Sequence, residues 1–189
     1  MKATGIVRRI DDLGRVVIPK EIRRNLRIRE GDPLEIFVDR EGSVILKKYS
    51  PIGELANFAR EYADAINDAT GRSVLISDRD SIIAVSGAPK KDFLGKSIGR
   101  LVENAMEERR AFINNYDADG SREMSIIADD RGEDNYRFSG EVICPIISQG
   151  DPIGTVIICD KKGNLPQLGE AERKVAQAAA GVLARQMEQ

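Results

Sequence analysis

The sequence predicts an α+β protein built from two modules of different kinds. Residues 1–50 read as short β-strands around one short helix, whereas residues 56–189 combine helical and strand periods. Charge divides at the same place, because residues 1–50 hold 12 Lys or Arg against 8 Asp or Glu, and the remainder holds 17 against 23. Residues 51–55, which contain a proline and a glycine, form the expected linker.

The first module is expected to fold only as a dimer. Its β-branched runs and turn residues predict strands at 5–10 and 15–18, a helix over about 20–26 that starts after Pro19, and a hairpin of 34–38 with 43–47. A unit of this size buries little apolar area, since cores below roughly 60 residues are marginal. No disulfide or metal site is available to support it. We therefore predict an obligate dimer whose strands interleave.

The second module reads as a largely antiparallel sheet flanked by helices, about 135 residues long. Helical spacing from Ile52 to Ile66 predicts a first helix that stops at Gly71, and the chain ends in a predicted helix over 170–187. Between them we expect strands at 73–77, 82–85 and 124–128, a broken or continuous helix over 92–113, and a hairpin of 138–147 with 153–159.

Composition argues against an enzyme, a metal protein and a membrane protein. The chain has no histidine, which removes Ser-His-Asp and Cys-His catalysis and His-ligated zinc. Its two cysteines do not form a C-x-x-C motif. Residues 115–126 imitate part of a calcium loop but have Asn at its first position and Ile126 in place of the bidentate Glu at its twelfth. No apolar run reaches the roughly 18 residues of a membrane span, and no secretory leader is visible. We therefore expect a cytoplasmic protein without catalytic residues, metal or known cofactor.

The most informative pattern is a cationic stripe on the short helix. Lys20, Arg23, Arg24 and Arg27 are spaced i, i+3, i+4 and i+7, and so share one face. The first predicted hairpin adds three more cations, Arg8, Arg9 and Arg15. One interpretation is a solvated charged surface without a partner. The other is a polyanion-binding face, which the concentration of charge in a dimeric module favours.

Residues 4–24, with the run Thr-Gly-Ile-Val-Arg-Arg-Ile-Asp-Asp-Leu-Gly-Arg-Val-Val-Ile-Pro, closely resemble the N-terminal DNA-binding domain of AbrB-type transition-state regulators. The second hairpin extends this resemblance across the module. It implies a swapped-hairpin dimer that contacts duplex DNA through the arginines matching the motif, Arg8, Arg15, Arg23 and Arg24. Arg9 and Lys20 complete the candidate DNA-binding set on the charge pattern.

Residues 54–64, 150–154 and 179–189 resemble sporulation regulators that join an AbrB-like domain to a GAF-type domain. The predicted order of helix, antiparallel sheet and closing helix is compatible with a GAF-like fold. The resemblance implies a homotetramer assembled through this domain. An unidentified small-molecule ligand is also possible, although residues 98–137 match only loosely and no ligand-binding residue can be assigned.

We therefore predict a DNA-binding transcriptional regulator, activating and repressing sporulation genes, with a regulatory GAF-like domain. Arginine contacts without a long recognition helix indicate tolerant, often A·T-rich, recognition. The resemblance implies a nucleoid location in the forespore. Two alternatives remain: an antitoxin-type DNA-binding protein whose C-terminal region binds a protein partner, and an enzyme based on the acidic module.

Cys144 and Cys159 are expected to be reduced, buried side chains. If Ser148 opposes Ile153 in the hairpin, both thiols lie on one face of the sheet, as diagonal neighbours about 7–8 Å apart. That separation is too long for an unstrained disulfide.

Overall fold

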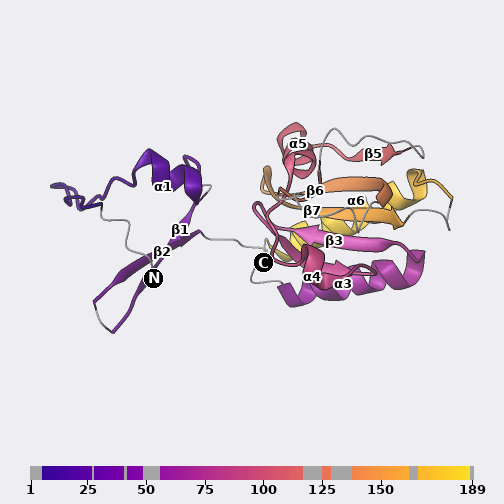
Figure 1. Ribbon diagram of the computed structural model, residues 1–189, viewed down its shortest axis with the longest axis horizontal. Helices are drawn as coiled ribbons and strands as arrows, with labels where there is room; N and C mark the ends of the chain where they lie inside the picture. Colours follow the sequence, from indigo (N-terminus) through magenta and orange to yellow (C-terminus); the bar gives the residue numbers. More distant parts are fainter. Residues whose placement is uncertain are drawn as a thin grey trace. The chain divides into compact units, whose positions relative to one another are not determined.

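The computed structural model describes residues 6–26, 28–40, 42–48, 56–116, 125–128, 138–161 and 166–187 (Figure 1). The chain divides into two compact units, Met1–Tyr49 and Ser50–Gln189, which we call the N-terminal and C-terminal units. The predicted linker at 51–55 lies outside the described residues.

The N-terminal unit contains one helix and one hairpin. Helix α1 spans Lys20–Asn25, and strands β1 (Leu34–Val38) and β2 (Val44–Lys48) pair antiparallel, with Ile36 opposite Leu46. The turn between the strands forms because Asp39 accepts the Ser43 N–H at 2.7 Å. These elements agree with the predicted helix and second hairpin.

The two strands predicted at 5–10 and 15–18 do not form in the single chain. Residues 6–10 and 15–18 have no regular secondary structure, although the turn between them is made: the Asp11 N–H donates to the Arg15 carbonyl at 3.1 Å. A strand needs a neighbour for its backbone groups, and no other described segment of this unit pairs with these residues. The strand prediction is therefore wrong for an isolated chain.

The C-terminal unit is built on a five-stranded antiparallel sheet in the order β4-β3-β7-β6-β5. The strands are β3 (Ser73–Ser77), β4 (Ile82–Ser86), β5 (Phe112–Asn115), β6 (Phe138–Ser148) and β7 (Asp151–Lys161). Every residue of β3 is buried, because helices cover both faces of the sheet's centre. Neighbouring strands also approach closely: a side chain at Gly154 would place its Cβ 2.1 Å from the Ser77 carbonyl oxygen.

One face of this sheet is covered by the two long helices. Helix α3 spans Ala56–Thr70, and it buries Ala59, Ala63 and Ile66 at helical spacing. Helix α6 spans Glu170–Gln186 and buries a stripe of alanines with Leu183 in the same cluster. Both helices were predicted at nearly these bounds, and α3 ends before Gly71, which has φ +67°.

The opposite face is covered by two short helices, α4 (Lys90–Phe93) and α5 (Arg100–Glu108). The helix expected over 92–113, broken or continuous, is broken between α4 and α5, and the prediction is wrong beyond Glu108. Gly95 has φ +75°, and Arg109 leaves the helix with φ 54°, after which the chain becomes β5. The predicted strand 124–128 is reduced, in its described part, to a single bridge between Ile98 and Ile127.

The two cysteines lie on opposite faces of the sheet, which corrects the predicted hairpin geometry. Cys144 opposes Val156 and belongs to the cluster under α3 and α6, whereas Cys159 opposes Glu141 and belongs to the cluster under α4 and α5. The pairing differs from the expected one by a single residue, and a shift of one residue reverses the face of every side chain. Neither cysteine forms a disulfide, and both are buried, as predicted.

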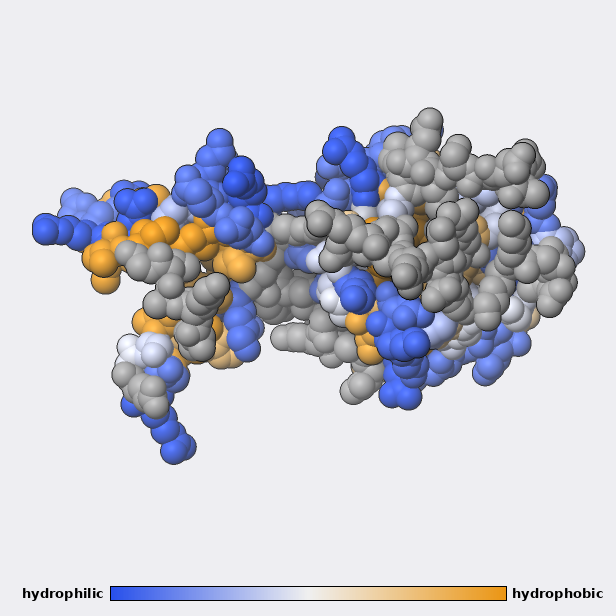
Figure 2. Space-filling view, in the orientation of Figure 1, coloured by the Kyte–Doolittle hydropathy of each residue, from blue (hydrophilic) through white to orange (hydrophobic). Residues whose placement is uncertain are grey.

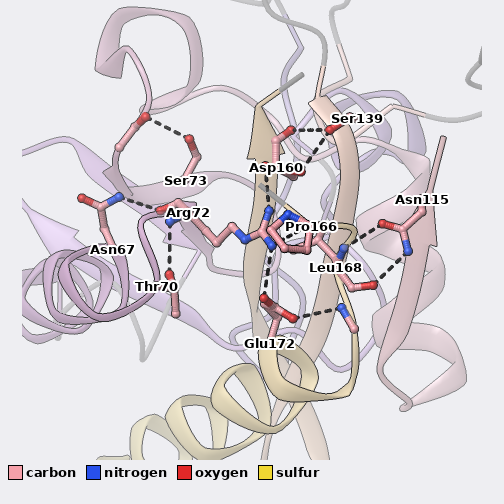
Figure 3. A network of polar contacts seen from close by, with 12 residues as sticks. Asn67, Thr70, Arg72, Ser73, Asn115, Ser139, Asp160, Pro166, Leu168 and Glu172 are labelled. Carbon is pink, nitrogen blue, oxygen red and sulfur yellow. Dashed lines mark hydrogen bonds and ion pairs between the residues drawn. The ribbon is translucent and has the colours of Figure 1, made fainter. Parts of the chain in front are cut away.

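A buried arginine links the ends of three elements on this scaffold (Figure 3). Arg72, which is 4% exposed, directs Nη1 to Asp160 Oδ1 at 2.8 Å and Nη2 to the Pro166 carbonyl at 2.6 Å. Nη2 also approaches Glu172 Oε1 at 3.3 Å, and the other oxygen of Glu172 accepts the Gly169 N–H at 2.9 Å. The start of β3, the end of β7 and the first turn of α6 are thereby held together.

Candidate nucleic-acid interface

The short helix α1 carries three of the predicted site residues. Lys20, Arg23 and Arg24 occupy exposed positions, while Ile22 is half-buried and Pro19, the N-cap, is buried. The Arg23 N–H donates to the Pro19 carbonyl at 3.0 Å, which forms the first turn. Residues spaced i, i+3 and i+4 share a helix face, so the three cations point together into solvent.

Arg15 is held in a tight turn by Asp11. Asp11 Oδ1 accepts the N–H groups of Leu13 (3.0 Å) and Arg15 (2.7 Å), and Oδ2 accepts Arg15 Nε at 2.7 Å. Gly14 supplies the turn's left-handed residue, with φ +78°. The hydrogen bonds from the backbone and side chain of Arg15, together with that from the Leu13 N–H, outweigh desolvation and lower the pKa of the Asp11 carboxyl.

Among the described residues, the other cations of the predicted set have no carboxylate partner. Within the described residues, no ion pair involves Arg8, Arg9, Lys20, Arg23 or Arg24, and all five side chains are exposed. Arg27, the last member of the predicted stripe, lies outside the described residues. Exposed cations without internal partners set up a positive potential that attracts polyanions.

Apolar side chains of the same unit are exposed in unusual number (Figure 2). Among its described residues only Pro19 is buried, while Val7 is 88% exposed and Val38 72%. Ten further large apolar side chains are at least 39% exposed: Ile6, Ile10, Leu13, Val16, Val17, Leu26, Ile36, Phe37, Val44 and Leu46. A soluble unit rarely leaves this much apolar area in water unless another surface covers it.

The long helices of the C-terminal unit also present apolar side chains outward. On α3, Phe58 is 46% exposed and Ala65 lies on the same face. On α6, Val182 is 37% exposed, and a Cβ at exposed Gly181 would meet no atom within 4 Å. Helices with small outward residues allow close approach of another helix.

Sequence reasoning identified the cations but missed the role of Asp11 in holding Arg15. The available signal was the spacing Asp-x-x-Gly-Arg, in which an aspartate caps a turn closed by glycine. Among the described residues, no cluster of Cys, Asp or Glu has the arrangement of a metal site. Within the same residues, no helix combines the length and apolar character needed to cross a bilayer.

Comparison with known proteins identifies the chain's family. A family model described as stage V sporulation protein T C-terminal, transcription factor, matches residues 54–188. Over all 189 residues the chain is 58% identical to stage V sporulation protein T of Bacillus subtilis (strain 168), and the match covers 100% of both. The chain belongs to the stage V sporulation protein T family. It is accordingly a transcription factor that regulates sporulation genes, as the sequence predicted.

Separate comparisons support the two parts of this family's architecture. The chain is 67% identical over 51 residues to the transition state regulatory protein AbrB of the same organism, a match covering 27% of this chain and about half (52%) of AbrB. A second family model, the bacterial antitoxin MazE, matches residues 7–54. The GAF domain of Acinetobacter phosphoenolpyruvate-protein phosphotransferase shares the fold, with TM-score 0.56 and 14% identity over 71% of this chain and 82% of that one. The predicted α+β architecture with an AbrB-like and a GAF-like domain is confirmed.

Proposed function

We propose that this protein binds duplex DNA through the cationic face of an interleaved dimer and so activates or represses sporulation genes. The face comprises the predicted set Arg8, Arg9, Arg15, Lys20, Arg23 and Arg24. The observation that carries the proposal is the combination, in one small unit, of an exposed apolar surface and exposed cations, five of which have no carboxylate partner among the described residues. The cations can bind DNA phosphates, and the apolar surface can pack against a second copy of the chain.

The dimer follows from the missing core of the N-terminal unit. Residues 6–10 and 15–18 are rich in β-branched side chains but unpaired in the single chain, and all of these apolar side chains except half-buried Ile18 are exposed. Pairing with the same segments of a second chain supplies both backbone partners and burial, at about 25 cal/mol for each Å² of apolar surface covered. Two cationic faces then lie on one two-fold assembly, which doubles the number of phosphates contacted.

The test of DNA binding is fluorescence anisotropy with a labelled A·T-rich duplex between about 50 and 300 mM salt. We expect a steep linear fall of log affinity with log salt concentration. Arg23→Ala and Arg24→Ala should each weaken binding about ten-fold and reduce the slope by about one, as the loss of one phosphate contact requires.

Arg40→Ala is the matched control for these variants. Arg40 is exposed in the turn between β1 and β2, in the same unit but away from α1 (Figure 1). Its loss removes the same charge from a position outside the proposed face. If Arg23→Ala keeps wild-type affinity and slope while its circular dichroism and dimer mass are unchanged, the assignment of the DNA face is wrong.

For the C-terminal unit we propose self-association of two dimers into a homotetramer through α3 and α6. Exposed Phe58 and Val182 carry this proposal, together with the open surface at Gly181. Sedimentation equilibrium is expected to give a tetramer for the full chain and a dimer for Phe58→Glu. Leu94→Glu is the matched control, because Leu94 is equally exposed (47%) but follows α4 on the other face of the sheet. A dimeric wild type at micromolar concentration would refute the tetramer.

A regulatory small-molecule ligand of the GAF-like domain and a nucleoid location in the forespore are further parts of the proposal. Thermal-shift screening of the full chain against metabolites tests the ligand. The match of residues 7–54 to MazE favours a second candidate, an antitoxin-type protein whose C-terminal region binds a protein partner. Full-length identity to a sporulation regulator makes it the weaker one. Specific, saturable binding of a toxin protein by the C-terminal unit would reverse that order.

A further inference from the structure

The turn at residues 11–15 places a carboxylate inside the proposed DNA face. Asp11 is bound by both the backbone and the side chain of Arg15, through Oδ1 to the N–H (2.7 Å) and Oδ2 to Nε (2.7 Å). An acidic side chain is unfavourable for binding DNA phosphates, so its position next to a binding arginine needs a compensating benefit. The geometry of the pair indicates what this benefit is.

Asp11 engages one edge of the Arg15 guanidinium and leaves the other free. The bond to Nε fixes the plane of the group, while both Nη nitrogens remain without partners among the described residues. The Arg15 side chain stays 69% exposed despite this contact. Two parallel N–H donors on a fixed plane match the two free oxygens of a phosphodiester.

Resting on the proposed function, we propose that Asp11 is a positioning residue that holds Arg15 ready for a bidentate contact with a DNA phosphate. An unattached arginine loses rotamer freedom when it binds, and this loss weakens binding. The Asp11 contact removes part of that cost before the DNA arrives. The same contacts lower the pKa of the Asp11 carboxyl, which favours its charged form.

The opposing possibility is that Asp11 only reduces the positive potential of the face. The two cases predict opposite signs for Asp11→Asn. The asparagine carbonyl oxygen still accepts the turn's N–H groups in the Oδ1 position, but its amide cannot accept Arg15 Nε. Asp12→Asn is the matched control, since Asp12 is exposed in the same turn, has no bond to another described side chain, and loses the same charge.

The experiment measures the affinity of the full-length variants for the A·T-rich duplex at fixed salt. If Asp11 positions Arg15, Asp12→Asn binds as tightly as wild type or more tightly, whereas Asp11→Asn binds about three-fold more weakly. The Arg15→Ala substitution then costs about ten-fold alone and only about three-fold in the Asp11→Asn background. Equal strengthening by Asp11→Asn and Asp12→Asn, or full additivity with Arg15→Ala, overturns the proposal.

Arg15→Lys provides a second test that leaves every Asp11 bond to the backbone in place. Lysine keeps the charge but lacks the planar fork, so binding should fall nearly as far as in Arg15→Ala. Wild-type binding by Arg15→Lys refutes the positioning role. Arg23→Ala distinguishes a failure of the proposed DNA face from a failure of the Asp11 proposal. If Arg23→Ala weakens binding while Asp11→Asn does not, the DNA face is supported and the positioning role of Asp11 is wrong. A wild-type protein that binds no DNA refutes both.

Discussion

Replacing Arg72 with methionine removes a buried charge from the C-terminal unit while keeping a long side chain in its place. Arg72 is 4% exposed, and its partner Asp160 is 5% exposed. The substitution leaves the Asp160 carboxylate buried without its 2.8 Å ion pair, and it takes the 2.6 Å donor from the Pro166 carbonyl. The damage therefore comes from the groups left behind more than from the contact that is lost.

The expected cost is large for a single substitution. Removing one member of a buried ion pair costs about 3–5 kcal/mol, and we expect about 4 kcal/mol for Arg72→Met. Domains are stable by only about 5–15 kcal/mol, so much of the margin disappears. Pairing Arg72→Met with Asp160→Leu should recover part of the loss, because no unpaired charge then stays buried.

Urea unfolding followed by circular dichroism at 222 nm measures this effect, because α3 and α6 dominate the helical signal. Protein concentration must be held constant among variants, since association shifts the midpoint. Arg173→Met is the matched control: Arg173 pairs with Glu170 on the outside of α6, and its loss should leave the midpoint within experimental error. Equal midpoints for Arg72→Met and Arg173→Met would refute the structural role of the buried arginine.

Three further predictions concern the same unit. Arg109→Gly should stabilise it by roughly 0.5 kcal/mol in urea unfolding, because Arg109 has φ 54°, a conformation that costs an L-residue more than glycine. Burial raises the pKa of Glu172, but bonds from the Gly169 N–H and its own N–H, with the charge of Arg72, outweigh it and lower the pKa overall. Its stabilising contribution is therefore present above the unfolded carboxyl pKa and lost as pH falls through the lower folded value. The difference between the urea midpoints of wild type and Glu172→Gln should therefore shrink as the pH is lowered through the carboxyl range. Burial raises the pKa of Cys144 to about 11, partly offset by the charge of Arg173, so a thiol reagent at neutral pH should label Cys144 only after unfolding.

Sequence patterns were most accurate for helices and strands whose buried residues recur at the regular spacing of the element itself. Helix α3 buries Ala59, Ala63 and Ile66 on one face, and this spacing can be recognised in the order of the residues alone. Strands β3 and β7 appear as apolar runs because helices cover both faces of the sheet. The cations of the candidate DNA face were predictable for the same reason, since helical spacing alone places Arg23 and Arg24 together.

Features decided by partners distant in sequence were not predictable. In the β6–β7 hairpin Ser148 opposes Asp151, two residues from the expected Ile153, and an irregularity between Ile146 and Ile147 shifts the register back by one. Both cysteines therefore pair one residue away from the expected position. The Arg72 network joins residues about 90 to 100 positions apart, which no local spacing records. The turn at Asp11 was predictable only in part. The residue types at 11–15 indicate the backbone turn, but the bond from Arg15 Nε depends on the conformation of the arginine side chain.

The failure of the predicted N-terminal strands and the composition of the DNA face have one physical cause in the proposed dimer. Residues 6–10 and 15–18 each combine cations with β-branched side chains, so the segments that carry Arg8 and Arg15 are also those that need a second chain for pairing and burial. Folding of this unit and association of two chains are then one equilibrium. A substitution such as Val16→Asp, which changes no cation, should therefore weaken DNA binding in proportion to the loss of dimer, and the loss should be recovered at higher protein concentration. Arg23→Ala should show no such recovery, because it removes a phosphate contact and leaves the dimer intact.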